Sequence, residues 1–216
     1  MGVFALDAYV LIVKGADRYK FLDGLSTNKV DGTCSTVFTT KNAKIIDMAD
    51  IIEMPEILAI IGHCPYKNKL IDHISSRILG QDVTISDVSD ANNVYISTND
   101  IEVSDGVTKV ETFRGFLIVA PTRIDITVDM TLEEFSEYRI QNLIPHQGYE
   151  ITEKVNPLVC GLGHLVHEAK GCYIGQEILV RMRSRGRINK KLVCVKNPTS
   201  NATTVGRIHS LKIDRA

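Results

Sequence analysis

The sequence of residues 33–62 is TCSTVFTTKNAKIIDMADIIEMPEILAIIG, in which runs of β-branched and other apolar residues are separated by short turns. The runs at 33–40, 44–53 and 56–62 predict consecutive strands, because β-branched residues fit the pleated surface of a sheet. The Lys-Asn pair at 41–42 predicts the turn between the first two. Strands joined by such short connections pair antiparallel, so this stretch predicts the centre of an antiparallel sheet.

The residues before this stretch predict a strand followed by a short helix. Residues 8–13 are a β-branched run, and Asp17 suits the N-cap of a helix that begins after it. The helix is expected to carry Phe21, Leu22 and Leu25 on one side, where they can face the sheet.

The residues after it predict a second helix and a further strand. Pro65 suits the first turn of this helix, and Gly80 suits its C-cap. Its apolar stripe consists of Leu70, Ile71, Ile74 and Ile78. Residues 82–88 alternate as a strand does. The order β-α-β-β-β-α-β over the first ~90 residues predicts an α+β fold with a mostly antiparallel sheet.

The second half predicts more strands and three helices. Residues 93–120 are expected to add strands, with Asp105-Gly106 as a hairpin turn. Residues 131–134, TLEE, are a capping box that opens a helix toward Gln141. The remaining elements expected are a helix over 157–169, a helix that starts near Gly175, and a β hairpin within 190–216 that turns at 197–201.

Composition excludes several classes of protein. A net charge of −1 excludes a generic nucleic-acid binder, and the absence of Trp with 6% aromatic residues argues against broad base-stacking platforms. The five cysteines form no C-x-x-C pair, which argues against a disulfide framework. The apolar runs are too short to cross a bilayer, and the N-terminus has no signal-peptide pattern, so we expect a cytoplasmic protein.

Cys172 is the strongest candidate for a reactive group. It lies between Gly171 and Gly175, just before an expected helix, and glycines permit a tight turn that displays the sulfur. A helix N-terminus and the neighbouring Lys170 would both stabilise the thiolate. The competing interpretation is a buried and inert cysteine, which is the common fate of a free thiol.

A second group of candidate ligands is Cys160, His164 and His167, which a helix over 157–169 would place on one face. With Cys172 they would supply four side chains that zinc or iron can use. Because no C-x-x-C pair is present, we expect these residues to be structural and assign no metal site.

Several motifs resemble the YgfZ branch of the folate-binding aminomethyltransferase-like superfamily. The most specific is KGCYIGQE at 170–177, and KIID at 44–47 is similar to a second signature of the family. Further matching segments are 13–18, Phe21-Leu22, 24–30, Arg139, Ile144-Pro145, 156–158 and Arg181. The resemblance covers about residues 10–190. It implies a folate-binding core at 1–187 and a vestigial C-terminal barrel segment at 188–216.

The resemblance also implies site residues and a cofactor. Catalytic roles fall to Cys172, Lys170, Gln176 and Glu177. Tetrahydrofolate is the implied cofactor, with Asn28, Asp47, Arg139, Tyr173 and Arg181 as cofactor-binding residues.

The function implied is the assembly or repair of iron–sulfur proteins through Cys172, with iron–sulfur client or assembly proteins as partners. The alternative is a tetrahydrofolate-dependent aminomethyl or one-carbon transferase, with tRNA among its substrates. A third class is a module that only binds folate.

Two departures from the transferase pattern weaken the folate alternative. Met48 and Leu117 stand where the glycine-cleavage transferase carries acids, and leucine offers no acceptor for the edge of a pterin. We therefore expect poor folate affinity and no glycine-cleavage activity.

A basic run follows the motif. It consists of Arg181, Arg183, Arg185, Arg187, Lys190 and Lys191, with no acid among them. Such a run can bind RNA phosphates or a folate polyglutamate tail, but a solvated face is the usual outcome and the one that we expect.

Overall fold

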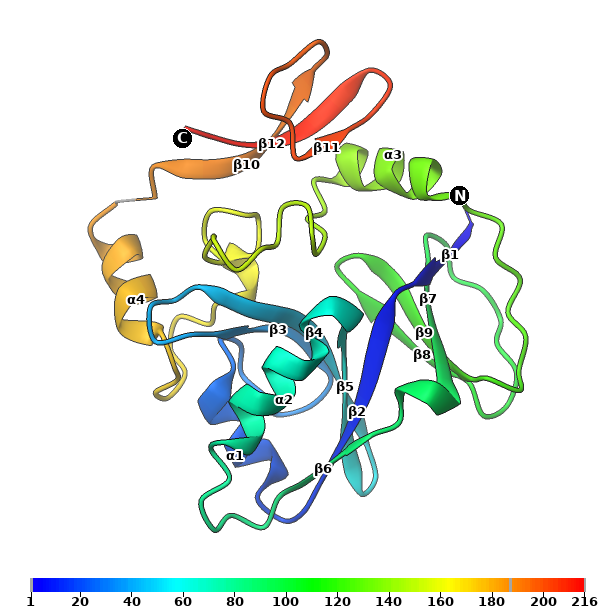
Figure 1. Cartoon of the computed structure of the whole chain (residues 1–216), viewed down its shortest axis with the longest axis vertical. Coiled ribbons are helices and arrows are strands. Elements are labelled where there is room, and N and C mark those ends of the chain that lie inside the picture. The colour runs from blue at the N-terminus through cyan, green and yellow to red at the C-terminus, as the bar shows by residue number, and fades with distance from the viewer. Residues whose placement is uncertain (1, 187, 216) are drawn as a thin grey trace.

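The computed structural model describes residues 2–186 and 188–215. Its centre is a five-stranded antiparallel sheet, and the predicted stretch 33–62 supplies three neighbouring strands of it (Figure 1). In spatial order the strands are β3 (Cys34–Thr39), β4 (Ile45–Met54), β5 (Ile57–His63), β2 (Ala8–Lys14) and β6 (Thr84–Asp87). The predicted antiparallel sheet is confirmed.

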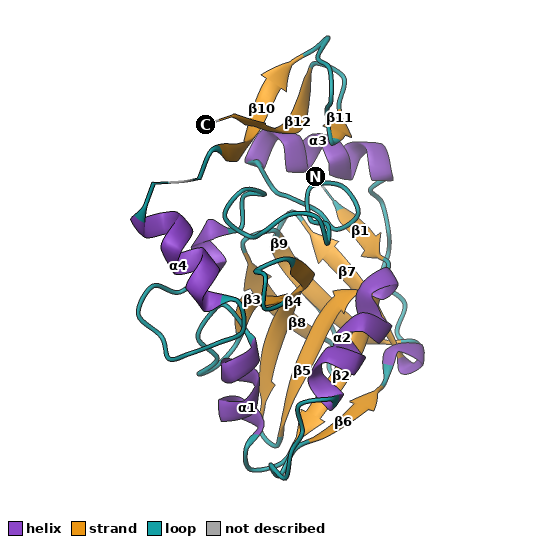
Figure 2. Cartoon of the chain, turned by 60° about the vertical axis from the view of Figure 1, so that its left-hand side comes forward, coloured by secondary structure: helices purple, strands orange, loops and turns teal. Residues whose placement is uncertain are grey.

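Two helices, α1 (Arg18–Leu25) and α2 (Lys67–Ser75), cover one face of this sheet (Figure 2). A 3₁₀ turn, η1 (Cys64–Tyr66), leads into α2 and contains Pro65. The buried apolar contacts include Phe21, Leu22 and Leu25 from α1 and Leu70 and Ile74 from α2, as their spacing predicted.

The predicted N-cap of the first helix is confirmed in position, although its side chain does not cap the helix, and the predicted C-cap of the second helix is wrong. Asp17 occupies the N-cap position of α1, but its carboxylate accepts a hydrogen bond from the Asp82 backbone N–H at 2.9 Å instead of capping the helix. The second helix ends at Ser75, so Gly80 lies beyond it, in the loop before β6. Ile78 still packs on the core from outside the helix.

A four-stranded antiparallel sheet packs on the other face of the central sheet. Its strands in spatial order are β1 (Val3–Leu6), β7 (Asn92–Ser97), β9 (Gly115–Pro121) and β8 (Thr108–Thr112). A 3₁₀ turn, η2 (Ser89–Ala91), precedes β7. The hairpin turn lies at 113–114, between β8 and β9, so the prediction of a hairpin at Asp105-Gly106 is wrong: that pair is a turn in the loop before β8.

The capping box predicted at 131–134 is confirmed. It opens α3 (Leu132–Asn142): Thr131 Oγ1 accepts from the Glu134 N–H at 3.2 Å, and Glu134 Oε2 accepts from the Thr131 N–H at 2.8 Å. The helix predicted over 157–169 is wrong, because only the 3₁₀ turn η3 (Gly163–Leu165) forms there. Gly161 has φ +89°, a backbone conformation that ends a helix.

The C-terminal strands form a three-stranded sheet beside α3 (Figure 1). The strands are β10 (Lys190–Lys196), β12 (His209–Arg215) and the short β11 (Thr204–Val205). β10 pairs antiparallel with β12, and β11 pairs with the other edge of β12. The predicted hairpin that turns at 197–201 is therefore wrong: the short connection lies at 206–208, between β11 and β12, and the strand that follows 197–201 does not pair with β10. A buried network joins this sheet to the core: Arg139 pairs with Glu150 at 3.0 Å and donates to Thr204 Oγ1 at 3.1 Å. A domain boundary at 187/188 stays a prediction.

Candidate functional site

Residues 170–175, here named the Cys172 loop, lead directly into α4 (Gln176–Ser184). The helix starts where the sequence predicted. Gly175 is its N-cap with φ +86°, and a Cβ there would lie 2.7 Å from Thr39 Oγ1 and from the Thr40 carbonyl oxygen. Thr39 Oγ1 donates to the Ile174 carbonyl at 2.6 Å. The loop is therefore fixed against the end of β3.

Cys172 is an exposed free thiol, as its flanking glycines predicted. Burial raises the pKa of the Cys34 and Cys64 thiols to about 11 and that of Cys160 to about 12, so few of these thiols are ionised near neutral pH. Cys194 is the other exposed thiol within the described residues, and it lies on β10, outside the motif.

Lys170 has a different role from the one predicted. Its side chain is 1% exposed, and its ammonium donates to the carbonyls of Asp23, Ser26 and Asn28 at 2.6–2.9 Å and pairs with the Asp23 carboxylate at 3.0 Å. These acceptors use all three ammonium protons. Lys170 thus ties the Cys172 loop to the end of α1, and its protons are not available to a thiolate.

Tyr173 anchors the other side of Cys172. The ring is buried, and the Lys170 Nζ lies 5.3 Å from its centroid. Its hydroxyl has no hydrogen-bond partner among the described residues. The structure thereby brings together Cys172, Lys170 and Tyr173 with Asn28, whose carbonyl binds Lys170.

Gln176 and Glu177 occupy the first turn of α4. Gln176 is half-buried and Glu177 exposed, and neither side chain forms a hydrogen bond within residues 2–186 and 188–215. Glu177 complements the positive end of the helix dipole. Arg181 is exposed one turn later, and a catalytic or binding role for these residues stays a prediction.

The proposed helical face of Cys160, His164 and His167 does not exist. Cys160 Sγ is buried against the Pro157 carbonyl at 3.8 Å, and His164 packs edge-on against Phe113. His167 Nδ1 accepts from the Ala169 N–H at 3.1 Å. The part of the chain that the structure describes contains no group of three or more His, Cys, Asp or Glu side chains placed to hold a metal ion.

Asp47 lies apart from the Cys172 loop, at the centre of a buried polar network. The carboxylate accepts from Tyr9 Oη at 2.8 Å and from the backbone N–H groups of Met48 and His63 at 2.8 and 3.1 Å. Gln147 Nε2 approaches it at 3.4 Å. Burial raises the pKa of Asp47 to about 7, although these donors act in the opposite direction.

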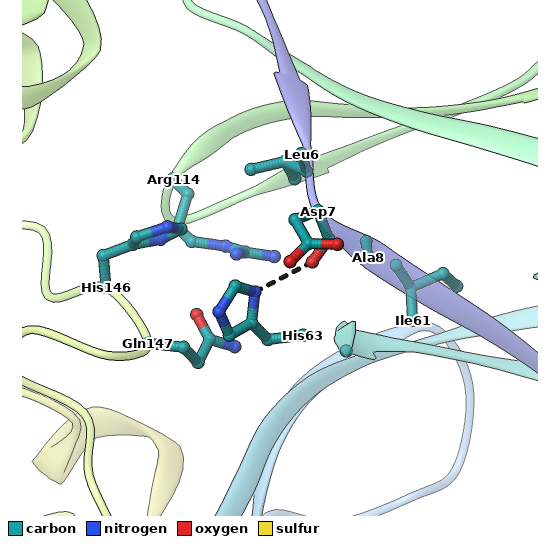
Figure 3. A pocket seen from close by; sticks show the side chains of 9 residues that line it. Leu6, Asp7, Ala8, Ile61, His63, Arg114, His146 and Gln147 are labelled. Carbon is teal, nitrogen blue, oxygen red and sulfur yellow. Dashed lines mark hydrogen bonds between the residues drawn. The ribbon is translucent and has the colours of Figure 1, made fainter. Parts of the chain in front are cut away.

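A cavity of about 10 Å³ lies beside this network and is here named the Asp47 cavity (Figure 3). Its lining includes Arg114, His146 and Gln147, each of which has a buried atom without a partner among the described residues: Nε, Nδ1 and Oε1, respectively. The volume and the polar groups suit one water molecule. Burial and the charges of Arg139 and Arg114 lower the pKa of His146 to about 3, so this imidazole is neutral.

Sequence reasoning missed most of this network. An Asp in a strand that is buried along most of its length was one signal, because such a carboxyl requires donors. Tyr9, His63, His146 and Gln147 had no comparable signal, since they are distant in sequence. Gly62 is required here: a Cβ at this position would collide with the Tyr9 hydroxyl and the Asp47 carboxylate.

The residues present do not fit a pterin in the way the resemblance implied. Arg139 is fully buried and paired with Glu150, so it has no free face for a ligand. Leu117 belongs to an apolar cluster with Val10 and Phe135 and offers no acceptor. The Asp47 cavity has room for about one water and not for a bicyclic ring.

No family model and no curated protein matches the chain. A solved structure does match: the glycine cleavage system aminomethyltransferase T from Bartonella henselae superposes with a TM-score of 0.78 over 99% of this chain and 78% of that one. The chain has the aminomethyltransferase fold. At 12% identity the likeness is one of fold alone. No helix within the described residues is long and apolar enough to cross a membrane.

Proposed function

We propose that this protein supports the assembly or repair of iron–sulfur proteins through the Cys172 thiol, on an aminomethyltransferase fold that no longer uses folate. The observation that carries the proposal is the exposed thiol at the start of α4. A thiolate attacks electrophiles and binds soft metals, which are the two kinds of chemistry such a role needs.

Three other residues of the Cys172 loop support this assignment because they hold the loop in place. Lys170 ties it to α1, Gly175 permits close packing on β3, and Tyr173 fills an apolar cluster. Within residues 170–175, Cys172 is the side chain that is exposed to solvent.

The alternative function, a tetrahydrofolate-dependent aminomethyl or one-carbon transferase, draws support from the fold only. Its ligand would need an acceptor at position 117 and space beside Asp47, and neither is present. We therefore expect no aminomethyl transfer in a reconstituted glycine-cleavage assay.

Complementation tests the proposed function. Cys172→Ser and, as a matched control, Cys194→Ser change the two exposed thiols. In cells that lack their own YgfZ-like protein, we expect Cys194→Ser to restore iron–sulfur enzyme activity as the wild type does, and Cys172→Ser to fail. Thermal unfolding of the purified variants checks that both fold. Full rescue by Cys172→Ser would falsify a thiol mechanism.

A further inference from the structure

The strand β10 forms one edge of the C-terminal sheet. The strand order β10-β12-β11 gives this seven-residue strand a single neighbour, β12. Among residues 2–186 and 188–215, no backbone group forms a hydrogen bond with the opposite side of β10. One long side of the strand is therefore unpaired.

The register of the sheet identifies the backbone groups on this side. Asn197, one residue beyond the strand, donates its N–H to the Ile208 carbonyl at 2.8 Å. Residues of an antiparallel pair alternate between those that bond to the neighbouring strand and those that point away, so residues 191, 193 and 195 bond to β12. The N–H and C=O groups that point to the free edge belong to Lys190, Leu192, Cys194 and Lys196, which are exposed or half-buried.

The free edge is positively charged. The strand KKLVCVK contains three lysines, all exposed, and no acid. On β12 the acid is Asp214, which pairs with Lys212 at 2.9 Å. Glu134 and Glu137 line a cavity together with Cys194, but Glu134 belongs to the capping box of α3 and Glu137 accepts from the Arg207 N–H. Acids near the strand thus have partners already, and the lysines remain available to a negative partner.

The structure divides the basic run found in the sequence. Arg183 lies on α4 and donates to the Val166 carbonyl at 2.9 Å, whereas Lys190 and Lys191 begin β10. Arg187 lies outside the described residues. Two lysines of the run therefore belong to the edge strand and not to the helix.

Charge and residue type decide among three occupants of the edge. Lysines on an edge strand repel a second copy of the same strand, which disfavours self-pairing. Single-stranded RNA would need aromatic rings for base stacking, and β10 contains none. An extended acidic polypeptide supplies both the missing backbone groups and carboxylates opposite the lysines.

We propose that β10 accepts an extended acidic segment of a partner protein as a fourth strand of the C-terminal sheet. Backbone hydrogen bonds to the free edge supply the affinity, and carboxylates that face Lys190, Lys191 and Lys196 supply the selectivity. The C-terminal sheet lies at one end of the molecule in both views, so a partner can reach it (Figure 1, Figure 2). The Cys172 thiol takes no part in this contact.

Amide hydrogen exchange, measured by NMR on the full chain, tests the strand addition directly. The probe is a peptide of four valine and threonine residues with two glutamates on each side. We expect the amides of Lys190, Leu192, Cys194 and Lys196 to exchange fast in the free protein and about tenfold or more slowly with saturating peptide. The amides of 191, 193 and 195 bond to β12 and should be protected in both states. An absence of new protection at the four edge amides would overturn the proposal.

Two N-methylated forms of the peptide separate strand pairing from plain charge attraction. One form carries N-methyl groups on every second residue of the central four, and the other carries them on the alternate set. Only one set can face β10, so one form should lose affinity about tenfold or more and the other should keep it. Equal affinity of the two forms would mean that charge alone binds the peptide, which contradicts strand addition.

Charge reversal tests the selectivity. Lys190→Glu combined with Lys191→Glu should weaken binding of the fluorescein-labelled peptide about tenfold or more in fluorescence anisotropy, and added salt should weaken binding to the wild type. The matched control is Lys14→Glu combined with Lys20→Glu, which changes the net charge equally at exposed lysines of β2 and α1 (Figure 1). An equal loss in both double variants would refute a role for the edge lysines.

Two other occupants have their own outcomes. A dimer in analytical ultracentrifugation, with protection of the same four amides that grows with protein concentration, would assign the edge to a second copy of the chain. Binding of labelled oligouridine that the Lys190→Glu, Lys191→Glu variant loses, with no protection by the peptide, would assign the lysines to RNA. Either result would overturn the proposal.

This inference and the proposed function can fail separately. Cys172→Ser should bind the peptide with the affinity of the wild type, because it leaves β10 unchanged. Full complementation by Cys172→Ser would therefore remove the thiol function and leave the edge strand as a docking site.

Discussion

The Cys172 loop and the network beside the Asp47 cavity differ in which polar group they expose to solvent. The loop buries Lys170 and Tyr173 to hold one exposed sulfur in solvent. The network beside the cavity buries the Asp47 carboxyl completely and surrounds it with donors. Exposure of Cys172 should therefore control the reactivity of its thiol, whereas substitutions of the buried groups Asp47 and Lys170 should change stability. Four measurements test this contrast, from the largest expected effect to the smallest.

Asp47→Ala should have the largest effect. It leaves the Tyr9 hydroxyl and the Met48 and His63 N–H groups without their acceptor in the core. Buried donors without partners are costly, so we expect the free energy of unfolding to fall by about 3 kcal/mol or more. Urea denaturation measures this loss. Asp105→Ala, at an exposed turn, is the control and should change the value by less than about 0.5 kcal/mol.

The second effect is a pH dependence of stability. The pKa of Asp47 is about 7 in the folded protein and about 4 in the unfolded chain, so between these values the native state retains a proton that the unfolded state releases. Stability from this group therefore falls as pH rises from about 4 to 7, by up to about 1.4 kcal/mol per pH unit, and is constant above that window.

The pKa values of His73 and His146 are lowered in the folded protein, to about 4 and about 3. These two groups make stability rise with pH, because the unfolded state binds more protons than the folded state between the two pKa values of each group. Comparison with Asp47→Asn isolates the aspartate, since both proteins share the histidines. The difference in unfolding free energy, wild type minus variant, should decrease between pH 5 and pH 7. A difference that is independent of pH would show that Asp47 does not titrate in this window.

The third effect is selective alkylation. Brief treatment with iodoacetamide at pH 8, followed by peptide mass mapping, should label Cys172 first. Cys34, Cys64 and Cys160 should react at least about tenfold more slowly, because burial shields them and raises their pKa values. Exposed Cys194 is the informative comparator. Equal rates at Cys172 and Cys194 would mean that the start of α4 adds nothing beyond exposure.

The smallest effect concerns Lys170→Met. The variant loses the ammonium that binds the carbonyls of Asp23, Ser26 and Asn28, so the free energy of unfolding should fall by about 1–2 kcal/mol. The alkylation rate of Cys172 should change by less than about twofold, since the ammonium is engaged elsewhere. A fivefold slower reaction in the folded variant would restore a direct role for Lys170 in activating the thiol.

Local patterns predicted local structure well. The strands within 33–62, the capping box at 131–134 and the start of α4 at Gly175 all depend on residues within a few positions of one another. The failures have a common cause as well. Local residue patterns favoured the helix over 157–169 and the hairpin at Asp105-Gly106. In the structure the first segment forms only a 3₁₀ turn, and the hairpin between β8 and β9 turns at 113–114, because tertiary contacts outweigh these local preferences.

The sequence by itself determined the antiparallel centre of the fold and the display of Cys172, because strand periodicity, glycine conformation and a helix start are properties of short segments. Only the tertiary structure decided what Lys170 binds, 147 residues away at Asp23, and what surrounds Asp47, where Gln147 reaches the Met48 carbonyl across 99 residues. Burial and long-range hydrogen bonds set the role of a charged group, and neither can be read from its neighbours in the chain.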